Sequence, residues 1–479
     1  MKVMVRQSPL LEAGSGLAVI GLYEGGKLPD EIVAIPGSDQ AQGGFKKLRL
    51  LHPEGSAWVL TVGLGRREDA DPERLRVAAA VAAKEAARLE AGSIAWALPE
   101  SGDGAVAAEA LVTGTILGSY RFDRFKGTNP DDPPAPTVES LTLLGPASVA
   151  AAAETARVYA EAQNRARDLQ SLPANVATPS YLGRRARSIA SAHEAVSAEV
   201  LGREQIVEKG MGGLAAVGQG SEEEPKLVVL RYAGGGSGPT LGLVGKGVTF
   251  DTGGISLKPG AGMHEMKYDM SGAAAVLEAM AAIAELGLAI DLLAVVPATE
   301  NMPSGSAIKP GDIITQYNGK TVEVNNTDAE GRLILADALA YAVELGAERV
   351  VDLATLTGAV TIALGSTYAA VVANDDDLAA AVARAGEESG ELTWRLPLHP
   401  EFKALMKGTV ADLSNLASKR KAGTITAASF LEEFVGDTPW AHVDIAGTAW
   451  DVGREYTGND ASGFGVRLLV ELARHLAAA

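Results

Sequence analysis

The sequence GLVGKGVTFDTGGISLKPGAGMHEMKYDMSGAAAV, residues 242–276, combines the features that decide the fold class. It begins with an apolar run that contains Lys246 and ends at Asp251. A glycine-rich loop with Lys258 follows, and Asp269 then precedes a run of very small residues. A strand, a loop and a helix in this order are the unit from which α/β domains are built. The stretch therefore predicts an α/β protein.

Further apolar runs of strand length occur in the same half of the chain. They lie at 226–232, 241–250, 292–296, 350–353 and 369–372, and helix-like segments separate them. Strands that alternate with helices form a sheet that the helices cover. We therefore expect a mixed, mostly parallel sheet in this half.

A hairpin is predicted at residues 315–324, TQYNGKTVEV. Its two β-prone ends flank Asn318-Gly319, the pair most typical of a type I′ turn. The sequence thus predicts a hairpin of two antiparallel strands at this position.

The N-terminal third predicts a smaller α/β domain. Strand-like runs at 17–23, 58–64 and 94–98 alternate with alanine-rich helical segments at 72–90 and 104–119. NPDDPPAPT, residues 129–137, is the clearest break in the chain, and one more apolar run follows at 141–144. We assign residues 1–147 to this domain, 148–170 to a linking helix, and 171–479 to a larger catalytic domain.

Length, charge and cysteine content narrow the class of protein. The 479 residues are too many for one ordinary core, which agrees with two domains. The net charge, 42 − 60 = −18, argues against a general nucleic-acid or anionic-membrane surface. The absence of cysteine excludes disulfides, thiolate metal sites and thiol nucleophiles. No uncharged stretch reaches membrane-spanning length and the first residues do not resemble a secretory signal, so we expect a soluble, cytoplasmic protein.

Several common catalytic motifs are absent. No G-x-S-x-G nucleophile elbow occurs, and HEMKY at 264–268 lacks the second histidine of the H-E-x-x-H zinc helix. LVGKGVTF at 243–250 is not a phosphate-binding P-loop, because the required first glycine and the hydroxyl residue after the lysine are missing. The candidate chemistry is therefore carried by carboxylates and lysines.

NNTDAEGRL, residues 325–333, places Asp328, Glu330 and Arg332 at alternate positions. A structural explanation exists, because Thr327 and Glu330 have the spacing of a helix capping box. That explanation leaves Asp328 without a role and puts the cation Arg332 in the first helical turn, where the helix dipole disfavours it. In an extended segment, Asp328 and Glu330 would point to the same side.

Asp251, Lys258 and Asp269 also have structural interpretations. They could be a turn residue, a solvated loop cation and a helix N-cap, respectively. Lys246 is harder to explain in this way, because lysine is rarely buried without a partner. Strict strand alternation would place Lys246 and Asp251 on opposite faces, so the chain must bend between them if they share a site.

Two divalent metal ions would make these residues compatible with one site. Four acids held together repel one another, whereas carboxylates can bridge a pair of cations. A lysine beside a dication can lose its proton and bind through its neutral nitrogen. A ligand set of oxygens with one amine, without histidine or cysteine, suits Zn²⁺ or Mn²⁺.

Five motifs resemble the leucyl aminopeptidases, dinuclear metallopeptidases that are also called cytosol aminopeptidases. They are NTDAEGRL at 326–333, VGKGVTFDTGGISLKPG at 244–260, MKYDMSGAAAV at 266–276, DLATLTGA at 352–359 and HVDIAG at 442–447. The resemblance covers about 160–470, in the same order and with similar spacing. It implies a smaller N-terminal α/β domain, a larger α/β/α catalytic domain and a homohexamer.

The resemblance also implies a role for each site residue. One metal would be bound by Lys246, Asp251, Asp269 and Glu330, and the other by Asp251, Asp328 and Glu330. The catalytic positions are Lys258, which would stabilise the oxyanion, and Arg332, which would hold a bicarbonate as general base. Substrate contacts are implied for Met266, Thr355, Leu356, Gly358 and Ala446. Thr448-Ala449-Trp450 is a possible departure from members with a bulkier pocket residue, and it bears on side-chain preference.

The expected function is the release of N-terminal residues, preferably leucine and other apolar ones, from peptides by two-metal hydrolysis. A hydroxide held between the metals would attack the scissile carbonyl. Two other functions stay open from the residues: a dinuclear phosphoesterase, and a non-enzymatic DNA-binding or scaffold role. Among these, nucleic acid is disfavoured as a partner by the net charge of −18.

Overall fold

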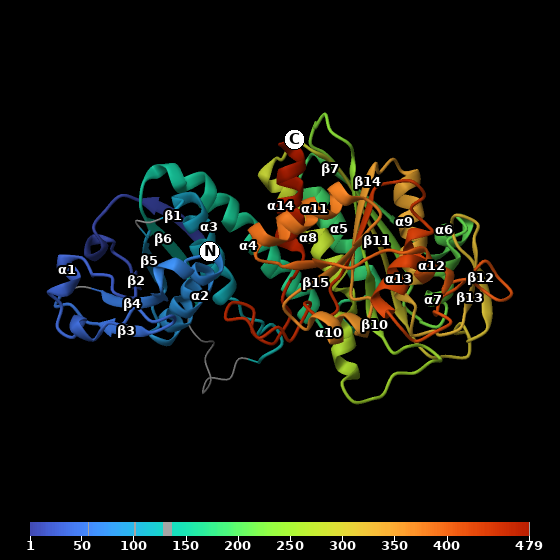
Figure 1. The fold of residues 1–479 in the computed structure, drawn as a ribbon, viewed down its shortest axis with the longest axis horizontal. Coiled ribbons are helices and arrows are strands. Elements are labelled where there is room, and N and C mark those ends of the chain that lie inside the picture. Colours follow the sequence, from blue (N-terminus) through green and yellow to red (C-terminus); the bar gives the residue numbers. More distant parts are fainter. Residues whose placement is uncertain (56, 100–101, 128–136, 479) are drawn as a thin grey trace. The chain divides into compact units, whose positions relative to one another are not determined.

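The computed structural model describes residues 1–55, 57–99, 102–127 and 137–478 (Figure 1). It forms two compact units, Met1–Asn164 with Gly453–Gly458, and Arg165–Val452 with Asn459–Ala479. The division at 164/165 falls inside the long helix α4, Ala150–Ser171. The predicted domain bounds stay a prediction, and the predicted break at 129–137 lies outside the described residues except for residue 137.

The first unit contains a six-stranded sheet in the order β1-β6-β5-β2-β4-β3. Its neighbours pair in parallel except for β3, which is antiparallel to β4. Helices α2 and α3 pack together and against this sheet. The bounds are β1 Lys2–Arg6, β2 Leu17–Tyr23, β3 Leu48–Leu51, β4 Trp58–Gly65, β5 Ser93–Ala97, β6 Ser140–Leu144, α1 Asp30–Val33, α2 Pro72–Arg88 and α3 Gly104–Gly118.

The second unit contains a nine-stranded sheet in the order β16-β15-β18-β14-β9-β11-β8-β7, with β10 paired to β11. The centre, from β18 to β11, is parallel, as are β10–β11 and β15–β16. The pairs β15–β18, β11–β8 and β8–β7 are antiparallel. The bounds are β7 Val196–Leu201, β8 Lys226–Ala233, β9 Leu241–Gly245, β10 Gly247–Asp251, β11 Asp291–Asn301, β14 Arg349–Ala354, β15 Ala369–Ala373, β16 Thr393–Arg395 and β18 Trp440–Asp444.

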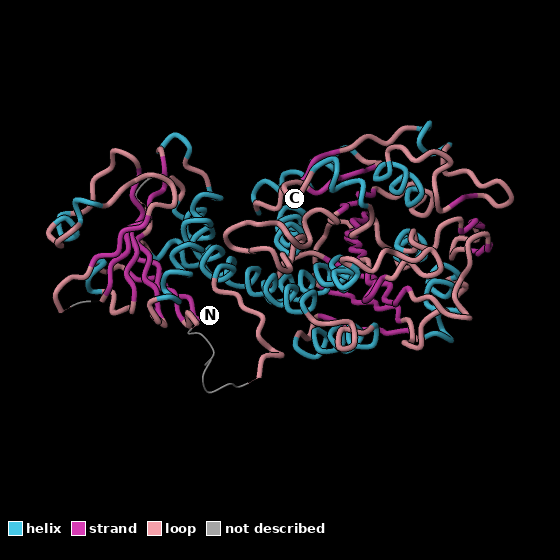
Figure 2. The backbone as a smooth tube through the Cα atoms, turned by 90° about the horizontal axis from the view of Figure 1, so that it is seen from below, coloured by secondary structure: helices cyan, strands magenta, loops and turns pink. Residues whose placement is uncertain are grey.

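Helices cover both faces of this sheet (Figures 1 and 2). One layer contains α5 (Pro179–Ala192), α8 (Ser271–Leu286), α11 (Asp376–Ser389) and α14 (Val466–Ala477), and the other contains α7 (Gly212–Gly218), α9 (Gly331–Glu344) and α13 (Gly423–Glu432). Shorter helices are α6 (Arg203–Glu208), α10 (Gly358–Leu364) and α12 (Pro400–Ala404). The predicted α/β/α architecture with a mixed, mostly parallel sheet is therefore confirmed.

Apolar residues at the start of α9 pack into the core between the sheet and the layer that contains α7, α9 and α13. Leu333 and Ile334 of α9 are fully buried in one cluster with Val244 of β9, Val295 of β11 and Leu214 of α7. Burial of such aliphatic side chains contributes roughly 1.5–3 kcal/mol each. Packing of α9 on the central strands thus holds the start of this helix at one edge of the sheet.

The predicted hairpin is present, but its predicted turn type is wrong. Strands β12 (Asp312–Thr315) and β13 (Thr321–Val324) pair antiparallel, and β17 (Leu413–Ser414) joins β13. Gly319 has a positive φ of 87°, whereas Asn318 is not among the residues with positive φ, and a type I′ turn needs both. The pairing of Gln316 N with Lys320 O, at 2.9 Å, leaves a three-residue loop with Gly319 last. Such a loop takes a left-handed residue only at its end.

Within the part of the chain that the structure describes, no helix has both the length and the apolar composition needed to cross a membrane.

Candidate active site

The apolar run at 241–250 is two strands, and Lys246 stands at the break between them. Strand β9 pairs with both β14 and β11, whereas β10 pairs only with β11 and shifts register between Val248 and Phe250. The Lys246 amide donates to Leu353 O at 3.0 Å, and its carbonyl accepts from Ala273 N at 2.8 Å. This break supplies the bend that strand alternation requires if Lys246 and Asp251 are to face one cavity.

Four acids and two lysines converge at the carboxyl ends of these strands, and we call this set the cavity cluster. Its members are Lys246, Asp251, Lys258, Asp269, Asp328 and Glu330. Asp251 ends β10, Asp269 lies in the 3₁₀ helix before α8, and the last two acids precede α9. Carboxylate oxygens of Asp251, Asp269 and Glu330 all lie within 4.8 Å of one another.

The two lysines pair with different acids of the cavity cluster. Lys246 Nζ lies 2.8 Å from Asp269 Oδ1 and 2.8 Å from Glu330 Oε1, and it donates to Thr355 O at 3.0 Å. Lys258 Nζ lies 2.8 Å from Asp251 Oδ2 and also contacts Asp328. The Lys246 residue is only 3% exposed, so it is a buried cation held by paired carboxylates.

Two glycines of the sequence motifs allow this close approach. At Gly331, an added Cβ would lie 2.5 Å from Lys246 Cε and 2.6 Å from its Nζ. Gly253 has φ +85°, and an added Cβ would lie 2.7 Å from Asp328 Oδ1. A side chain at either position would displace a member of the cavity cluster, so the glycines belong to the site rather than to a generic loop.

The capping-box explanation of Thr327 is wrong. Helix α9 begins at Gly331 with Glu330 as N-cap, and no side chain caps it. Thr327 Oγ1 instead donates to Gly253 O at 2.6 Å and accepts from Ser256 N at 2.8 Å. Thr327 therefore ties the loop before α9 to the loop after β10.

Asn301 is a site residue that the sequence interpretation missed. Its Nδ2 donates to Asp251 Oδ1 at 2.8 Å and to Thr327 O at 3.0 Å. Gly253 N also donates to Asp251 Oδ1, at 2.9 Å, so this oxygen has two donors while Oδ2 faces Lys258. Asn301 is the last residue of β11, and Asp251 is the last residue of β10, which pairs in parallel with β11. A polar residue at the end of a strand next to Asp251 was the signal that could have identified Asn301 as a site residue.

Burial and mutual repulsion shift the pKa values of the cavity cluster. Burial raises the pKa of Asp269 well above its ordinary value and raises the pKa of Glu330, helped by the nearby charge of Asp251. Burial also raises the pKa of Asp328. Burial alone would lower the pKa of each lysine, but the surrounding carboxylates outweigh it and raise both pKa values. Four carboxylates against two lysines leave a charge of −4 + 2 = −2.

The donor set of the cavity cluster fits divalent metal ions. Among the described residues, Asp269 Oδ2 and Glu330 Oε2 are buried side-chain oxygens without a hydrogen-bond partner. Leaving such an atom unpaired costs about 1–3 kcal/mol or more, so unpaired carboxylate oxygens in a cluster where acids outnumber lysines are suited to bind a cation. Oxygens with one amine nitrogen suit Zn²⁺ or Mn²⁺.

All twelve predicted site residues line one cavity of about 300 Å³. They are Lys246, Asp251, Lys258, Met266, Asp269, Asp328, Glu330, Arg332, Thr355, Leu356, Gly358 and Ala446. The structure thus brings together residues that are separated by up to two hundred positions in the sequence. It also assigns the Thr355 hydroxyl a contact with the acids, because Thr355 Oγ1 donates to Asp269 Oδ1 at 2.8 Å.

Arg332 lies in the first turn of α9, beside the cavity cluster. It is 9% exposed, and its guanidinium donates to Asn415 O at 2.8 Å. Burial lowers its pKa to about 10, opposed by the charges of Glu330 and Asp444. Its Nε has no partner among the described residues, so the guanidinium retains capacity to bind an anion.

The same cavity is lined by residues that the sequence interpretation did not assign. They are Ala329, Gly331, Thr357, Thr361 and Trp450. The Trp450 ring stacks on the Tyr268 ring with 5.3 Å between centroids and 17° between planes. Trp450 belongs to Thr448-Ala449-Trp450, the possible departure at the pocket noted in the sequence, and this was the signal for its role.

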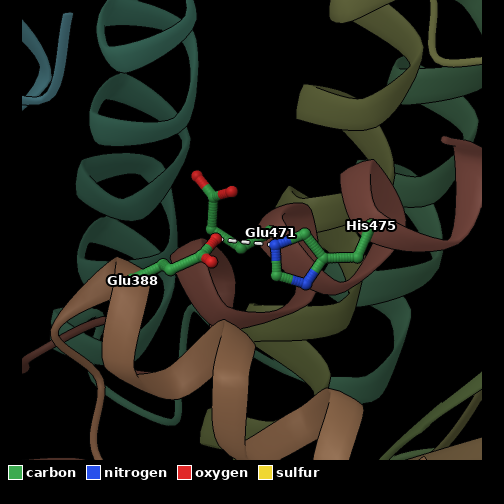
Figure 3. A group of neighbouring side chains, drawn as sticks. All are labelled: Glu388, Glu471 and His475. Carbon is green, nitrogen blue, oxygen red and sulfur yellow. Dashed lines mark hydrogen bonds and ion pairs between the residues drawn. The ribbon is translucent and has the colours of Figure 1, made fainter.

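A second group of possible metal ligands joins α11 and α14, and we call it the outer cluster. It contains Glu388, Glu471 and His475 (Figure 3). His475 Nε2 lies 2.6 Å from Glu388 Oε2, and Arg474 donates to both oxygens of Glu471 at 2.7 and 3.0 Å. Arg384 donates to Glu388 at 2.9 Å. Because arginine cations already pair with these acids, the outer cluster is an ion-pair network between helices.

A buried centre of acids and lysines with unpaired carboxylate oxygens, lining a small cavity, fits the metal sites of metal-dependent hydrolases. Comparison with known proteins places the chain within that class. Residues 164–470 match the catalytic domain of the cytosol aminopeptidase family, and residues 39–129 match the N-terminal domain of that family. The chain belongs to the cytosol aminopeptidase family, and it is a metal-dependent aminopeptidase.

Individual relatives agree over almost the whole length. The probable cytosol aminopeptidase of Roseiflexus castenholzii is 45% identical over 490 residues, covering 99% of both chains. That of Geobacter sp. strain M21 is 44% identical over 493 residues, covering 99% of this chain and 100% of that protein. The solved structure of the bottromycin maturation enzyme BotP in complex with Mn has a TM-score of 0.88 and 35% identity, covering 97% of this chain and 100% of that chain.

Proposed function

We propose that this chain removes the N-terminal residue of peptides with two divalent metal ions in the cavity cluster, and that it prefers leucine and other apolar residues. The observation that carries the proposal is the convergence of the cavity cluster with a small, partly apolar pocket in one cavity of about 300 Å³. Membership of the cytosol aminopeptidase family supports it.

The ligand assignment follows the motifs. Lys246, Asp251, Asp269 and Glu330 would hold one metal, while Asp251, Asp328 and Glu330, with the Asp328 carbonyl, would hold the other. The unpaired oxygens of Asp269 and Glu330 support this assignment. When bound, the metals would supply Lewis acidity and lower the pKa of water to generate the nucleophile. Zinc or manganese would serve, and the Mn bound to the similar BotP structure supports manganese.

The lysines have different tasks in this proposal. Lys258, an ammonium paired with Asp251 and Asp328, would stabilise the negative charge that develops on the carbonyl oxygen of the substrate. Lys246 would have to release its proton to bind metal, because only the neutral amine has a lone pair. Its position between Asp269 and Glu330, 2.8 Å from each, supports a ligand role.

Arg332 would hold an anion that accepts a proton from the attacking water. A helix N-terminus favours anions, and the Arg332 side chain lies in the first turn of α9. Bicarbonate at this position would act as the general base. The unpaired Nε of Arg332, within the described part of the chain, supports the anion-binding role.

The substrate side chain would occupy the apolar part of the cavity. Met266, Ala446 and Gly358 line it with apolar or small surfaces, and Thr355 and Leu356 complete the wall. An apolar side chain loses less by desolvation there than a charged one. We also propose a homohexamer in the cytoplasm that acts on peptides and binds neither nucleic acid nor membranes.

Cleavage of blocked and free peptides tests the function. The enzyme should cleave Leu-Gly peptides and leucine anilide but should fail on the N-acetylated peptide. The free α-amine of the substrate would bind one metal, and the amide nitrogen of an acetylated peptide cannot replace it. Chelation should abolish cleavage, and added Zn²⁺, Mn²⁺ or Mg²⁺ should identify the metal that restores it. Equal rates on the acetylated peptide, or hydrolysis of a phosphate ester instead, would refute the proposal.

A further inference from the structure

The motif HVDIAG contains a buried acid, Asp444, that the proposed chemistry does not use. HVDIAG begins on β18 and DLATLTGA begins on β14, and these two strands are parallel neighbours in the centre of the sheet. Ala354 is in register with Asp444, the last residue of β18. Asp444 is fully buried, and it is not a member of the cavity cluster.

The Asp444 carboxylate binds three groups that line the cavity. Asp444 Oδ1 accepts from Leu356 N at 3.1 Å and from Ala446 N at 3.2 Å. Asp444 Oδ2 accepts from Thr357 Oγ1 at 2.6 Å. Leu356 and Thr357 follow β14, whereas Ala446 follows β18, so one carboxylate joins the two loops that form the wall of the pocket.

The contact with Thr357 extends this link to a helix. Thr357 is the N-cap of α10, and its side chain accepts from Val360 N at 3.3 Å. Helix α10 begins at Gly358, and Thr361 on its first turn also lines the cavity. The position of α10 relative to the loop after β18 therefore depends on Asp444.

A buried carboxylate is costly unless donors compensate it. Burial raises the pKa of Asp444; the nearby His442 opposes that rise most strongly, followed by the hydrogen bonds from Thr357, Ala446 and Leu356. A buried acid with three donors is typical of a group that holds a fixed arrangement of backbone. Each of these donors belongs to a residue at the cavity, which separates Asp444 from a buried acid that only stabilises the core.

We propose that Asp444 is a positioning residue for the substrate side-chain pocket: it sets the distance between the loop after β14 and the loop after β18, and so it determines discrimination between N-terminal side chains. This inference rests on the proposed function, because it takes the pocket as the site of the N-terminal side chain. It assigns Asp444 no metal and no contact with the substrate.

The test compares kcat/KM for leucine anilide and alanine anilide in the metal-loaded enzyme. In Asp444→Ala, the leucine-to-alanine ratio should fall by roughly tenfold or more, because a displaced wall loses contacts that the larger side chain makes. The change should appear mainly as a higher KM for leucine anilide. Metal content should stay at the wild-type value, since Asp444 is not a ligand.

Two threonine variants keep the test decisive if Asp444→Ala fails to fold. Thr357→Val removes, at nearly constant volume, the hydroxyl that binds Asp444, Thr424 Oγ1 and Val360 N, and it should lower the ratio. Thr357→Ser keeps the hydroxyl and should retain most of the wild-type ratio. Asp337→Asn is the control: Asp337 is also fully buried and accepts Leu214 N at 2.9 Å and Tyr317 N at 2.8 Å, but neither of these donor residues lines the cavity. It should leave the ratio unchanged.

The outcomes distinguish the inference from the proposed function. An unchanged ratio in both Asp444→Ala and Thr357→Val overturns the inference, and so does an equal fall in Asp337→Asn. Loss of metal in Asp444→Ala also overturns it, because Asp444 would then act on the metal centre. A wild-type enzyme that cleaves neither anilide overturns the proposed function instead, and removes the basis of the inference.

Discussion

The cavity cluster and the outer cluster both bring potential metal ligands within 4.8 Å, yet their surroundings differ. In the cavity cluster, the acids come from strand ends and loops, are largely buried, and include two oxygens without partners among the described residues. In the outer cluster, Glu388 is 43% exposed at its side chain, and arginines pair with both acids. The buried atom without a partner there, among the described residues, is the ring nitrogen His475 Nδ1 and not a carboxylate oxygen. Proximity of acids therefore does not define a metal site; buried carboxylate oxygens without partners and an excess of acids over cations do.

The largest effect is expected for Glu330→Ala, because Glu330 would bind both metals. Bound metal should fall well below two per subunit, and leucine anilide hydrolysis should fall to background. Elemental analysis of the purified variant measures the first, and a rate assay the second. Glu388→Ala of the outer cluster is the matched control, and it should retain the wild-type metal content and rate of leucine anilide hydrolysis. A full metal complement in Glu330→Ala would refute the bridging role.

Lys246→Arg separates a ligand from a counter-ion. Arginine keeps the positive charge between Asp269 and Glu330, but its guanidinium stays protonated and has no lone pair to offer a metal. We expect the variant to fold and to lose one metal per subunit, with a fall in activity of about 10²-fold or more. Lys403→Arg, which keeps an ion pair outside the cavity, serves as the control. Two metals and near-normal turnover would show that Lys246 acts only as a cation.

Arg332→Ala should slow turnover without loss of metal. Arg332 contacts Asn415 O rather than an acid of the cavity cluster, so both metals should remain. Loss of the anion that it would hold should lower kcat by roughly 10²-fold, within the range of general base catalysis. Steady-state kinetics with and without added bicarbonate measure this effect. If bicarbonate accelerates the variant and the wild type equally, the anion does not bind at Arg332.

The smallest effect is expected in the outer cluster. His475→Gln removes the contact with Glu388, which lies at a partly exposed position between α11 and α14. We expect metal content and kcat/KM to match the wild type, and stability to change by at most ~1 kcal/mol. Thermal unfolding monitors the stability. A loss of metal in this variant would erase the distinction between the two clusters.

The members of the cavity cluster could be named from the sequence because each lies in a local motif, and the structure brings them to one cavity; their individual roles stay predictions. Strand alternation required a bend between Lys246 and Asp251 if they share a site, and the structure has a strand break at Lys246. Asn301 and Asp444 could not be assigned in this way. Their roles come from hydrogen bonds to segments that only the folded sheet brings together, such as Asn301 to Asp251 and Asp444 to Leu356.

Local patterns in the sequence also led to two wrong predictions. Thr327 had the spacing of a capping box, but its hydroxyl binds the loop after β10. Asn318-Gly319 had the composition of a type I′ turn, but the pairing of Gln316 with Lys320 lengthened the loop. Hydrogen bonds to a distant segment decided the role of Thr327, and the pairing register of the two strands decided the hairpin turn; local propensity is only a weak guide to either.

The measurement that tests the central claim most directly is anomalous diffraction from crystals of the protein loaded with Mn²⁺ or Zn²⁺. The account predicts two anomalous peaks per subunit within the cavity cluster, one beside Lys246 and Asp269 and the other beside Asp328, with Asp251 and Glu330 between them. It predicts no peak at Glu388, Glu471 and His475. A single peak in the cavity, or metal bound only at the outer cluster, would contradict the two-metal assignment.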